Sequence, residues 1–237
     1  MSHIAKNILK KSFSDRFKLD MNEKLLVVIL GSFGDFDSFE YCQILSSNLK
    51  RLIKKRINLL VLGIGNEGSR ERFSEYTNLP IDLIESVIDD KIHRELGLDN
   101  GRHYPFGSIF NIFTMCLGLN SPGTLSEVLR GYLGDKTANR VYEDNQIIKI
   151  NRYLSFNSSS FDLLDSGQYL RPFELATHRL TNLIEILSNW SSYVPNVAYL
   201  PQRPGTFVFD QNGELIYSYI AKSLLCYSET MKEPLTF

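Results

Sequence analysis

The sequence has few cysteines, little net charge and no long hydrophobic run, and each absence excludes a class of protein. Its 237 residues include three cysteines, Cys42, Cys116 and Cys226, with no CxxC motif. So sparse and odd a set is not typical of a disulfide scaffold, a zinc site or a dithiol redox motif. With 26 Lys and Arg against 27 Asp and Glu, the net charge is −1. The chain therefore lacks the surplus of cations that nucleic-acid binding needs, and we expect no nucleic-acid partner.

The absence of long apolar runs argues against a transmembrane segment. The longest mostly apolar stretch, residues 106–119, is shorter than a bilayer requires and carries Ser108, Asn111 and Thr114. Polar residues interrupt the first apolar positions of the chain, so we expect no secretory signal peptide. The hydrophobic fraction of 43% is typical of a soluble globular protein with a sizeable core.

Two short patterns that resemble ligand sites are better explained by local structure. Residues 63–68 match GxGxxG, a phosphate-binding pattern. They follow the second predicted strand, and no strand ending in an acidic residue lies about 20 residues further on, so we interpret them as a tight turn. Asp89, Asp90 and His93 lie at the start of a short predicted helix, where carboxylates commonly act as caps. We therefore expect no metal and no cofactor.

Two continuous apolar runs, residues 24–30 and 57–64, predict strands that are buried on both faces. Such strands are typical of a parallel sheet. The residues between them predict an amphipathic helix, with Cys42 on its apolar face and Asp35 or Asp37 as its cap. The sequence therefore predicts a βαβ unit, which belongs to the α/β class.

Further elements are indicated by capping residues and by a third apolar stretch. Ser69 is expected to cap a helix over residues 69–76, and Thr124 a helix over residues 125–132. Residues 81–87 predict a third buried strand.

The second half of the chain is predicted to be mainly helical between residues 101 and 197. A long helix over residues 172–190 carries apolar residues at alternating spacings of three and four, which indicates core packing or a dimer contact. Residues 206–210 and 214–220 flank an Asn-Gly pair and predict a hairpin.

The first 20 residues form a basic, amphipathic arm with a local surplus of three positive charges. Its apolar residues recur at helical spacing. Such a segment either docks on its own domain or contacts an anionic membrane surface or a partner protein.

Several long blocks, occurring in the same order, carry a resemblance to a known family. They include VVILGSFGDFDSFEYCQIL, DDKIHRELGL, SPGTLSEVLRGYLGD, RPFELATHRLTNLIEILSNW and PQRPGTFVFDQNGELIY. The chain resembles the alkyl hydroperoxide reductase/thiol-specific antioxidant (AhpC/TSA) family of the thioredoxin superfamily, and more closely its peroxiredoxin-like members from cyanobacteria and chloroplasts. The resemblance implies an α/β thioredoxin-like fold, a central mixed sheet flanked by helices. It also implies one domain over residues 21–237, enlarged by a helical insertion at about 101–197.

The resemblance implies a redox centre at the start of the first helix, where this chain departs from the family pattern. The two cysteines of the CxxC form correspond to Asp35 and Ser38. Cys42 lies one helical turn later, on the apolar face of the helix. A thiol buried in apolar surroundings is inert, so we favour a core role for Cys42, with catalysis as the alternative.

Two further family features are expected near the end of the fold. Pro204 corresponds to the cis-proline that lies beside the active site in thioredoxin-like proteins. Arg203 corresponds to an arginine that stabilises the thiolate and the peroxide. With no thiolate opposite, we favour an ion pair between Arg203 and either Asp35 or Asp37.

Two functions therefore remain open. The first is a non-catalytic binding or assembly module, with residues 1–20 and 101–197 as surfaces for a protein partner. The second is a thiol-dependent peroxide or disulfide oxidoreductase that uses Cys42 as nucleophile and Arg203 as its electrostatic partner. The resemblance implies a cytoplasmic or chloroplast-stroma protein, peripheral to a photosynthetic (thylakoid) membrane complex.

Overall fold

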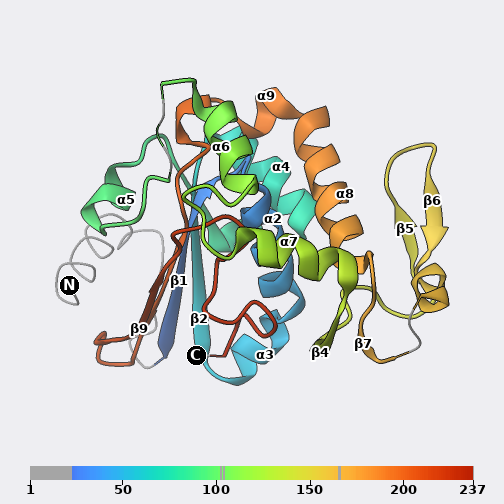
Figure 1. Cartoon of the computed structure of the whole chain (residues 1–237). Coiled ribbons are helices and arrows are strands. Elements are labelled where there is room, and N and C mark those ends of the chain that lie inside the picture. Colours follow the sequence, from blue (N-terminus) through green and yellow to red (C-terminus); the bar gives the residue numbers. More distant parts are fainter. Residues whose placement is uncertain (1–22, 102, 104, 165–166, 237) are drawn as a thin grey trace.

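A five-stranded mixed sheet forms the centre of the protein (Figure 1). The computed structural model describes residues 23–101, 103, 105–164 and 167–236, so the basic arm over residues 1–20 lies outside the described residues. The strands lie in the order β3 (Ile84–Val87), β2 (Ile57–Ile64), β1 (Lys24–Ser32), β8 (Gly205–Phe209) and β9 (Leu215–Ile220). The first three are parallel, and β8 and β9 pair in antiparallel fashion. This arrangement confirms the predicted βαβ unit and the C-terminal hairpin.

Strand β1 is buried on both faces, which explains its uninterrupted apolar sequence. Val28 and Leu30 belong to a core cluster with residues of α2 and α4, whereas Val27 and Ile29 belong to a second cluster on the other face. Side chains alternate between the two faces of a strand, so a strand covered on both sides favours apolar residues at successive positions.

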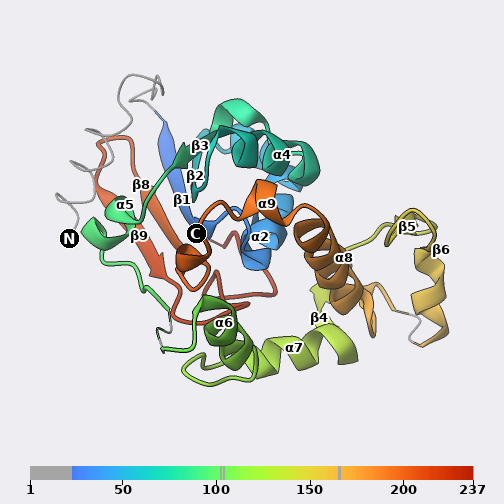
Figure 2. The ribbon, with the colours of Figure 1, turned by 90° about the horizontal axis from the view of Figure 1, so that it is seen from above.

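The helices cover the two faces of the sheet unequally, as Figure 2 shows. On one side lie α2 (Phe36–Ser47), α4 (Glu67–Thr77), α8 (Glu174–Ser188) and α9 (Trp190–Tyr193). On the other side lies the short helix α5 (Lys91–Glu95), and α3 (Leu49–Lys54) leads from α2 into β2. A mixed sheet flanked by helices in this way is the thioredoxin-like fold expected from the resemblance.

Two predicted helix caps are corrected. Helix α4 begins at Glu67, its N-cap is Asn66, and Ser69 instead completes a reciprocal capping box by bonding to the N-cap backbone. Helix α7 (Thr124–Leu133) includes Thr124 within its first turn. The Thr124 hydroxyl donates 2.8 Å to the carbonyl of Leu224, so it ties α7 to the C-terminal segment rather than capping the helix.

The segment between β3 and β8 contains helices and small sheets beside the main sheet. Helix α6 (Ser108–Cys116) precedes α7, and β4 (Asp135–Asn139) pairs with β7 (Tyr169–Leu170). Strands β5 (Ile147–Lys149) and β6 (Ser155–Asn157) form a hairpin that projects away from the main sheet (Figure 1). Short 3₁₀ helices lie at Ile81–Leu83, Ser158–Leu163 and Val197–Tyr199. The first of these 3₁₀ helices occupies the start of the strand predicted over residues 81–87, so β3 begins only at Ile84.

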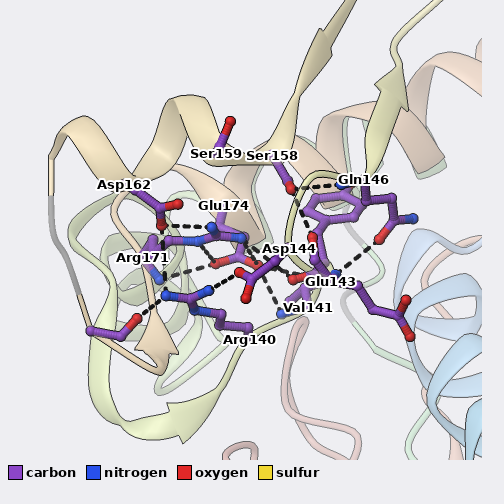
Figure 3. Close-up of polar contacts among 12 residues, drawn as sticks. Arg140, Val141, Glu143, Asp144, Gln146, Ser158, Ser159, Asp162, Arg171 and Glu174 are labelled. Atoms are coloured by element: carbon purple, nitrogen blue, oxygen red, sulfur yellow. Dashed lines mark hydrogen bonds and ion pairs between the residues drawn. The ribbon is translucent and has the colours of Figure 1, made fainter.

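A buried ion pair fixes the hairpin to the start of α8 (Figure 3). The Arg171 guanidinium donates 2.9 Å to Glu174 and 2.7 Å to Asp162. Glu174 also accepts the backbone N–H groups of Val141 and Tyr142 at 2.9 and 2.8 Å. Arg171 and Glu174 have no exposed side-chain surface, so this network lies buried beside the small apolar cluster of Ile148, Ile150 and Phe161.

Helix α8 is only partly buried, and its residues at spacings of three and four, which indicated core packing or a dimer contact, include exposed leucines. Leu175 and Ile186 are buried, but Leu180, Leu183 and Leu187 expose 49%, 39% and 58% of their surface. These three leucines line a cavity between α8 and the α6–α7 pair. None of the helices within the described ranges is long and apolar enough to cross a membrane.

Candidate functional site: the start of helix α2

The end of β1 turns tightly into α2 and touches the loop that precedes β8. A Cβ atom on Gly31 would lie 2.3 Å from the carbonyl oxygen of Gln202, so this close approach requires glycine. On the same loop, the Arg203 N–H donates 2.9 Å to the carbonyl of Asp99. These backbone contacts bring Arg203 against the first turn of α2.

A helix cap forms at Asp35 and Ser38, the positions at which the resemblance implies the two cysteines of the CxxC form. Asp35 is the N-cap of α2, and its carboxylate accepts the Asp37 N–H at 3.4 Å. The Ser38 hydroxyl donates 3.3 Å to the other oxygen of Asp35. All three residues are buried. Asp35 thus takes the anion-stabilising position at the helix N-terminus that a thiolate would otherwise occupy.

Arg203 is fully buried and is held by four groups. Its Nη1 donates 3.1 Å to Asp37 Oδ2, and Nη2 lies 3.8 Å from Asp35 Oδ1. Its Nε and Nη2 donate to the carbonyls of Pro201 and Leu200 at 2.8 and 3.1 Å. The structure therefore contains the expected ion pair between Arg203 and the start of α2, and Asp37 is the nearer partner.

The cluster of Asp35, Asp37 and Arg203 holds two carboxyl groups for one guanidinium. Burial raises the pKa of Asp37 well above its usual value, the Asp35 carboxylate raises it further, and Arg203 opposes both effects. Burial also raises the pKa of Asp35, again against Arg203. Asp37 Oδ2 accepts the Leu225 N–H at 2.7 Å, but the buried Oδ1 has no hydrogen-bond partner within the described chain. The pair therefore retains a proton at pH values at which exposed carboxyls are ionised.

Cys42 does not face this cluster. It has no exposed surface and belongs to the core between α2 and the sheet. Burial raises the pKa of its thiol, which disfavours the thiolate needed for nucleophilic attack. Burial also raises the pKa of Cys116 and of Cys226 to about 11, and all three thiols are free.

Pro204 does not have the expected conformation. No cis peptide bond occurs in the described part of the chain, so the prediction of a cis-proline is corrected. The residue still lies at the expected place, directly before β8, where its carbonyl accepts the Ala221 N–H at 3.0 Å.

A cavity of about 660 Å³ opens beside the start of α2. Most of its lining is apolar and comes from α6, α7, α8 and α9, including Trp190, the one tryptophan of the chain. Gly34, Asp35 and Phe36 also line it, as does Cys116. The cavity therefore lies at the position where the resemblance implies a redox centre.

A second buried ion pair, which sequence reasoning missed, forms one side of this cavity. Arg179 of α8 donates 2.6 and 3.1 Å to the two carboxylate oxygens of Glu40 of α2. The Tyr227 hydroxyl donates 2.9 Å to Glu40, and Arg179 also contacts Glu127 of α7 at 3.3 Å. Arg179 and Glu40 are 139 positions apart in sequence, and no local spacing could have signalled their contact.

Comparisons with known proteins agree with the fold. The family model described as AhpC/TSA antioxidant enzyme matches residues 44–223, about three quarters of the chain. The matched region begins after Asp35, Ser38 and Cys42 and includes Arg203. Neither the curated proteins nor the solved structures yield a match. From its sequence over residues 44–223 and its thioredoxin-like sheet, the chain belongs to the AhpC/TSA antioxidant enzyme family.

Proposed function

We propose that this member of the AhpC/TSA family has lost thiol-dependent catalysis and acts as a binding module. The observation that supports this most directly is the buried cluster of Asp35, Asp37 and Arg203 at the start of α2. A peroxidatic thiol must be accessible and must have a lowered pKa. Here a carboxylate caps the helix, and the arginine that would stabilise a thiolate is bonded to Asp37 instead.

The alternative is a thiol oxidoreductase, and membership of the family favours it. Cys42 would be its nucleophile, with Arg203 as electrostatic partner. This role requires a rearrangement, because Cys42 is fully buried and every nitrogen of Arg203 already has a partner. We therefore favour the binding module.

Activity and thiol reactivity together test the choice. The purified protein is assayed for reduction of hydrogen peroxide, an alkyl hydroperoxide and a model disulfide, with thioredoxin or glutathione as reductant. We expect no turnover above that of the Cys42→Ser variant. We also expect iodoacetamide to modify Cys42 only after unfolding in urea, because its thiol is buried. Turnover that disappears in Cys42→Ser, or rapid alkylation of Cys42 in the folded protein, refutes the proposal.

A protein partner at a photosynthetic membrane remains the setting that the resemblance implies. The exposed apolar residues of α6 and α7 provide surface for such a partner, among them Phe110, Phe113, Leu129 and Leu133. Co-purification from gently solubilised thylakoid or cyanobacterial membranes tests this part. Recovery only as a free monomer argues against it.

A further inference from the structure

The cavity beside α2 has the dimensions and walls of a small-molecule site. Its volume of about 660 Å³ lies within the range of about 300–1,000 Å³ that is usual for ligand pockets. Buried lining residues, including Gly34, Asp35, Ile186 and Leu225, form its floor. Because both the floor and the walls belong to one chain, a ligand would be enclosed on several sides.

The mouth of the cavity is apolar and remains uncovered in the described chain. Its exposed lining residues are Ile109, Phe113, Tyr132, Leu180, Leu183 and Leu187. Each of these side chains leaves a third or more of its surface in water. Covering such surface is favourable in proportion to the apolar area removed from water, so the walls favour a ligand with an apolar body.

One of the two charged residues in the lining is already neutralised. The Arg179 guanidinium is bonded to both carboxylate oxygens of Glu40, to the carboxylate of Glu127 and to the Glu127 carbonyl. Its positive charge is therefore not available to an anionic ligand. A fatty acid anion that entered the cavity would find no free cation among these residues.

The floor of the cavity adjoins one carboxyl group more than it has cations. Asp35 lines the cavity, and behind it Asp37 and Asp35 share the single guanidinium of Arg203. The Asp35 carboxyl group accepts two long hydrogen bonds, from the Ser38 hydroxyl at 3.3 Å and from the Asp37 N–H at 3.4 Å. Asp37 keeps a fully buried oxygen without a partner. A positively charged donor at the floor would complement this cluster by replacing the proton that the two carboxyl groups retain.

From these contacts, and building on the proposed binding function, we propose that the cavity binds an amphiphilic amine. The apolar body lies between α6, α7 and α8, and the ammonium group lies at the floor against the Asp35 carboxylate. The ligand class is defined by this chemistry: one cationic nitrogen at the end of an apolar chain or ring system. A neutral alcohol of equal length fits the walls but brings no positive charge to the carboxyl groups, and a carboxylate finds no free cation among the lining residues.

Three probes that differ only in the head group test the proposal, namely dodecylammonium, dodecanol and dodecanoate. The two ionic probes are used below their critical micelle concentrations and dodecanol below its solubility limit. The fluorescence of Trp190 reports binding directly, because this residue lines the cavity and the chain has no other tryptophan. A charged hydrogen bond changes affinity by about tenfold or more. We therefore expect dodecylammonium to bind about tenfold more tightly than dodecanol, and dodecanoate to bind least.

Two variants, each with a control, test separately the binding of the ammonium group and the binding of the apolar chain. Asp35→Asn keeps the helix cap, since Asn caps as well as Asp, and should reduce dodecylammonium affinity to that of dodecanol. Asp82→Asn, an exposed carboxylate outside the lining, is its control. Val128→Phe fills the cavity and should weaken all three probes. Leu133→Phe, which introduces the same side chain on the same helix at a position that is 72% exposed and outside the lining, should weaken none.

A measurement on the unaltered protein guards against a variant that misfolds. Dodecylammonium should slow the reaction of Cys116 with N-ethylmaleimide, because Cys116 lines the cavity. Cys226 has the same raised pKa of about 11 but lies outside the lining, so its reaction should be unchanged.

Three results overturn the inference: dodecanoate or dodecanol binding as tightly as the amine, unchanged amine affinity in Asp35→Asn, or equal reaction of Cys116 with and without ligand. None of these bears on peroxide turnover. Conversely, thiol-dependent turnover refutes the proposed loss of catalysis but does not alter the order of affinities of the three probes. Failure of the ligand inference and failure of the proposed function can therefore be told apart.

Discussion

Replacing Arg203 by methionine should destabilise the protein severely, because the change removes the single cation from a buried cluster of two carboxyls. Methionine keeps an apolar stem of similar length but donates no hydrogen bond. Asp37 then loses its 3.1 Å contact, and the carbonyls of Pro201 and Leu200 lose their donors. Removing one partner of a buried ion pair costs about 3–5 kcal/mol. That is a large share of the total stability of about 5–15 kcal/mol that is usual for a domain.

Urea unfolding followed by Trp190 fluorescence measures this loss. With an m-value of about 3 kcal/mol per molar urea, a loss of this size lowers the midpoint by about 1 M or more. The double variant Arg203→Met/Asp37→Asn should recover part of the loss, because it also removes the stranded charge. A loss below about 1 kcal/mol for the single variant, or a double variant no more stable than the single, would refute the pairing.

The change of this stability loss with pH provides a second test of the ion pair, and its direction follows from the pKa shifts of the two carboxyl groups. Both carboxyl pKa values are raised in the folded protein, so the folded state binds protons more tightly than the unfolded chain. The associated stability is fully present below the unfolded value of about 4 and is lost as the pH rises through the folded values. Arg203 opposes this shift. The deficit of Arg203→Met should therefore be larger at about pH 8 than at about pH 5, and a deficit independent of pH contradicts the assignment.

Two further predictions concern buried polar groups away from the cavity. Glu174→Gln should lower the free energy of unfolding by about 3–5 kcal/mol in urea, because Glu174 is fully buried against Arg171. The control is Glu67→Gln, which should lower it by less than about 1 kcal/mol, because the Glu67 side chain is 58% exposed beside Arg70. Equal losses in the two variants would contradict this prediction. Burial lowers the pKa of His93, whose Nε2 lies 2.7 Å from the Leu30 carbonyl. Its contribution to stability is thus present above the unfolded value of about 6.5 and is lost as the pH falls through the lower folded value. Between about pH 7 and pH 5, wild type should lose more stability than His93→Gln, and parallel curves would argue against this role.

The sheet and the first helix could be predicted from sequence because their signals are local. The apolar runs of β1 and β2 reflect burial on both faces, and the Asn-Gly pair marks the turn between β8 and β9. Asp35 as the cap of α2 and the burial of Cys42 followed from the same local patterns. The pairing of Arg203 was expected only because the resemblance placed it beside the start of that helix.

The cavity could not be predicted because it depends on contacts between distant segments. The 3-4 spacing of the α8 leucines indicates an apolar face but does not say what covers it. In the structure α6 and α7 lie beside that face without filling it. The Arg179–Glu40 pair, which joins α8 to α2, likewise leaves no periodic trace in the sequence.

The start of α2, where the resemblance implies a redox centre, can stabilise an anion but carries carboxyl groups and no thiol. A helix N-terminus stabilises an anion, whether it is a thiolate or a carboxylate. A thiolate there is a nucleophile, but the carboxylate of Asp35 is a cap, and its neighbour Asp37 takes the arginine. The segment between β3 and β8 provides α6, α7 and α8 as apolar walls around the same point. The start of α2 thus has charged groups but no nucleophile, and it lies beside a cavity large enough for a small ligand. This combination favours ligand binding over catalysis.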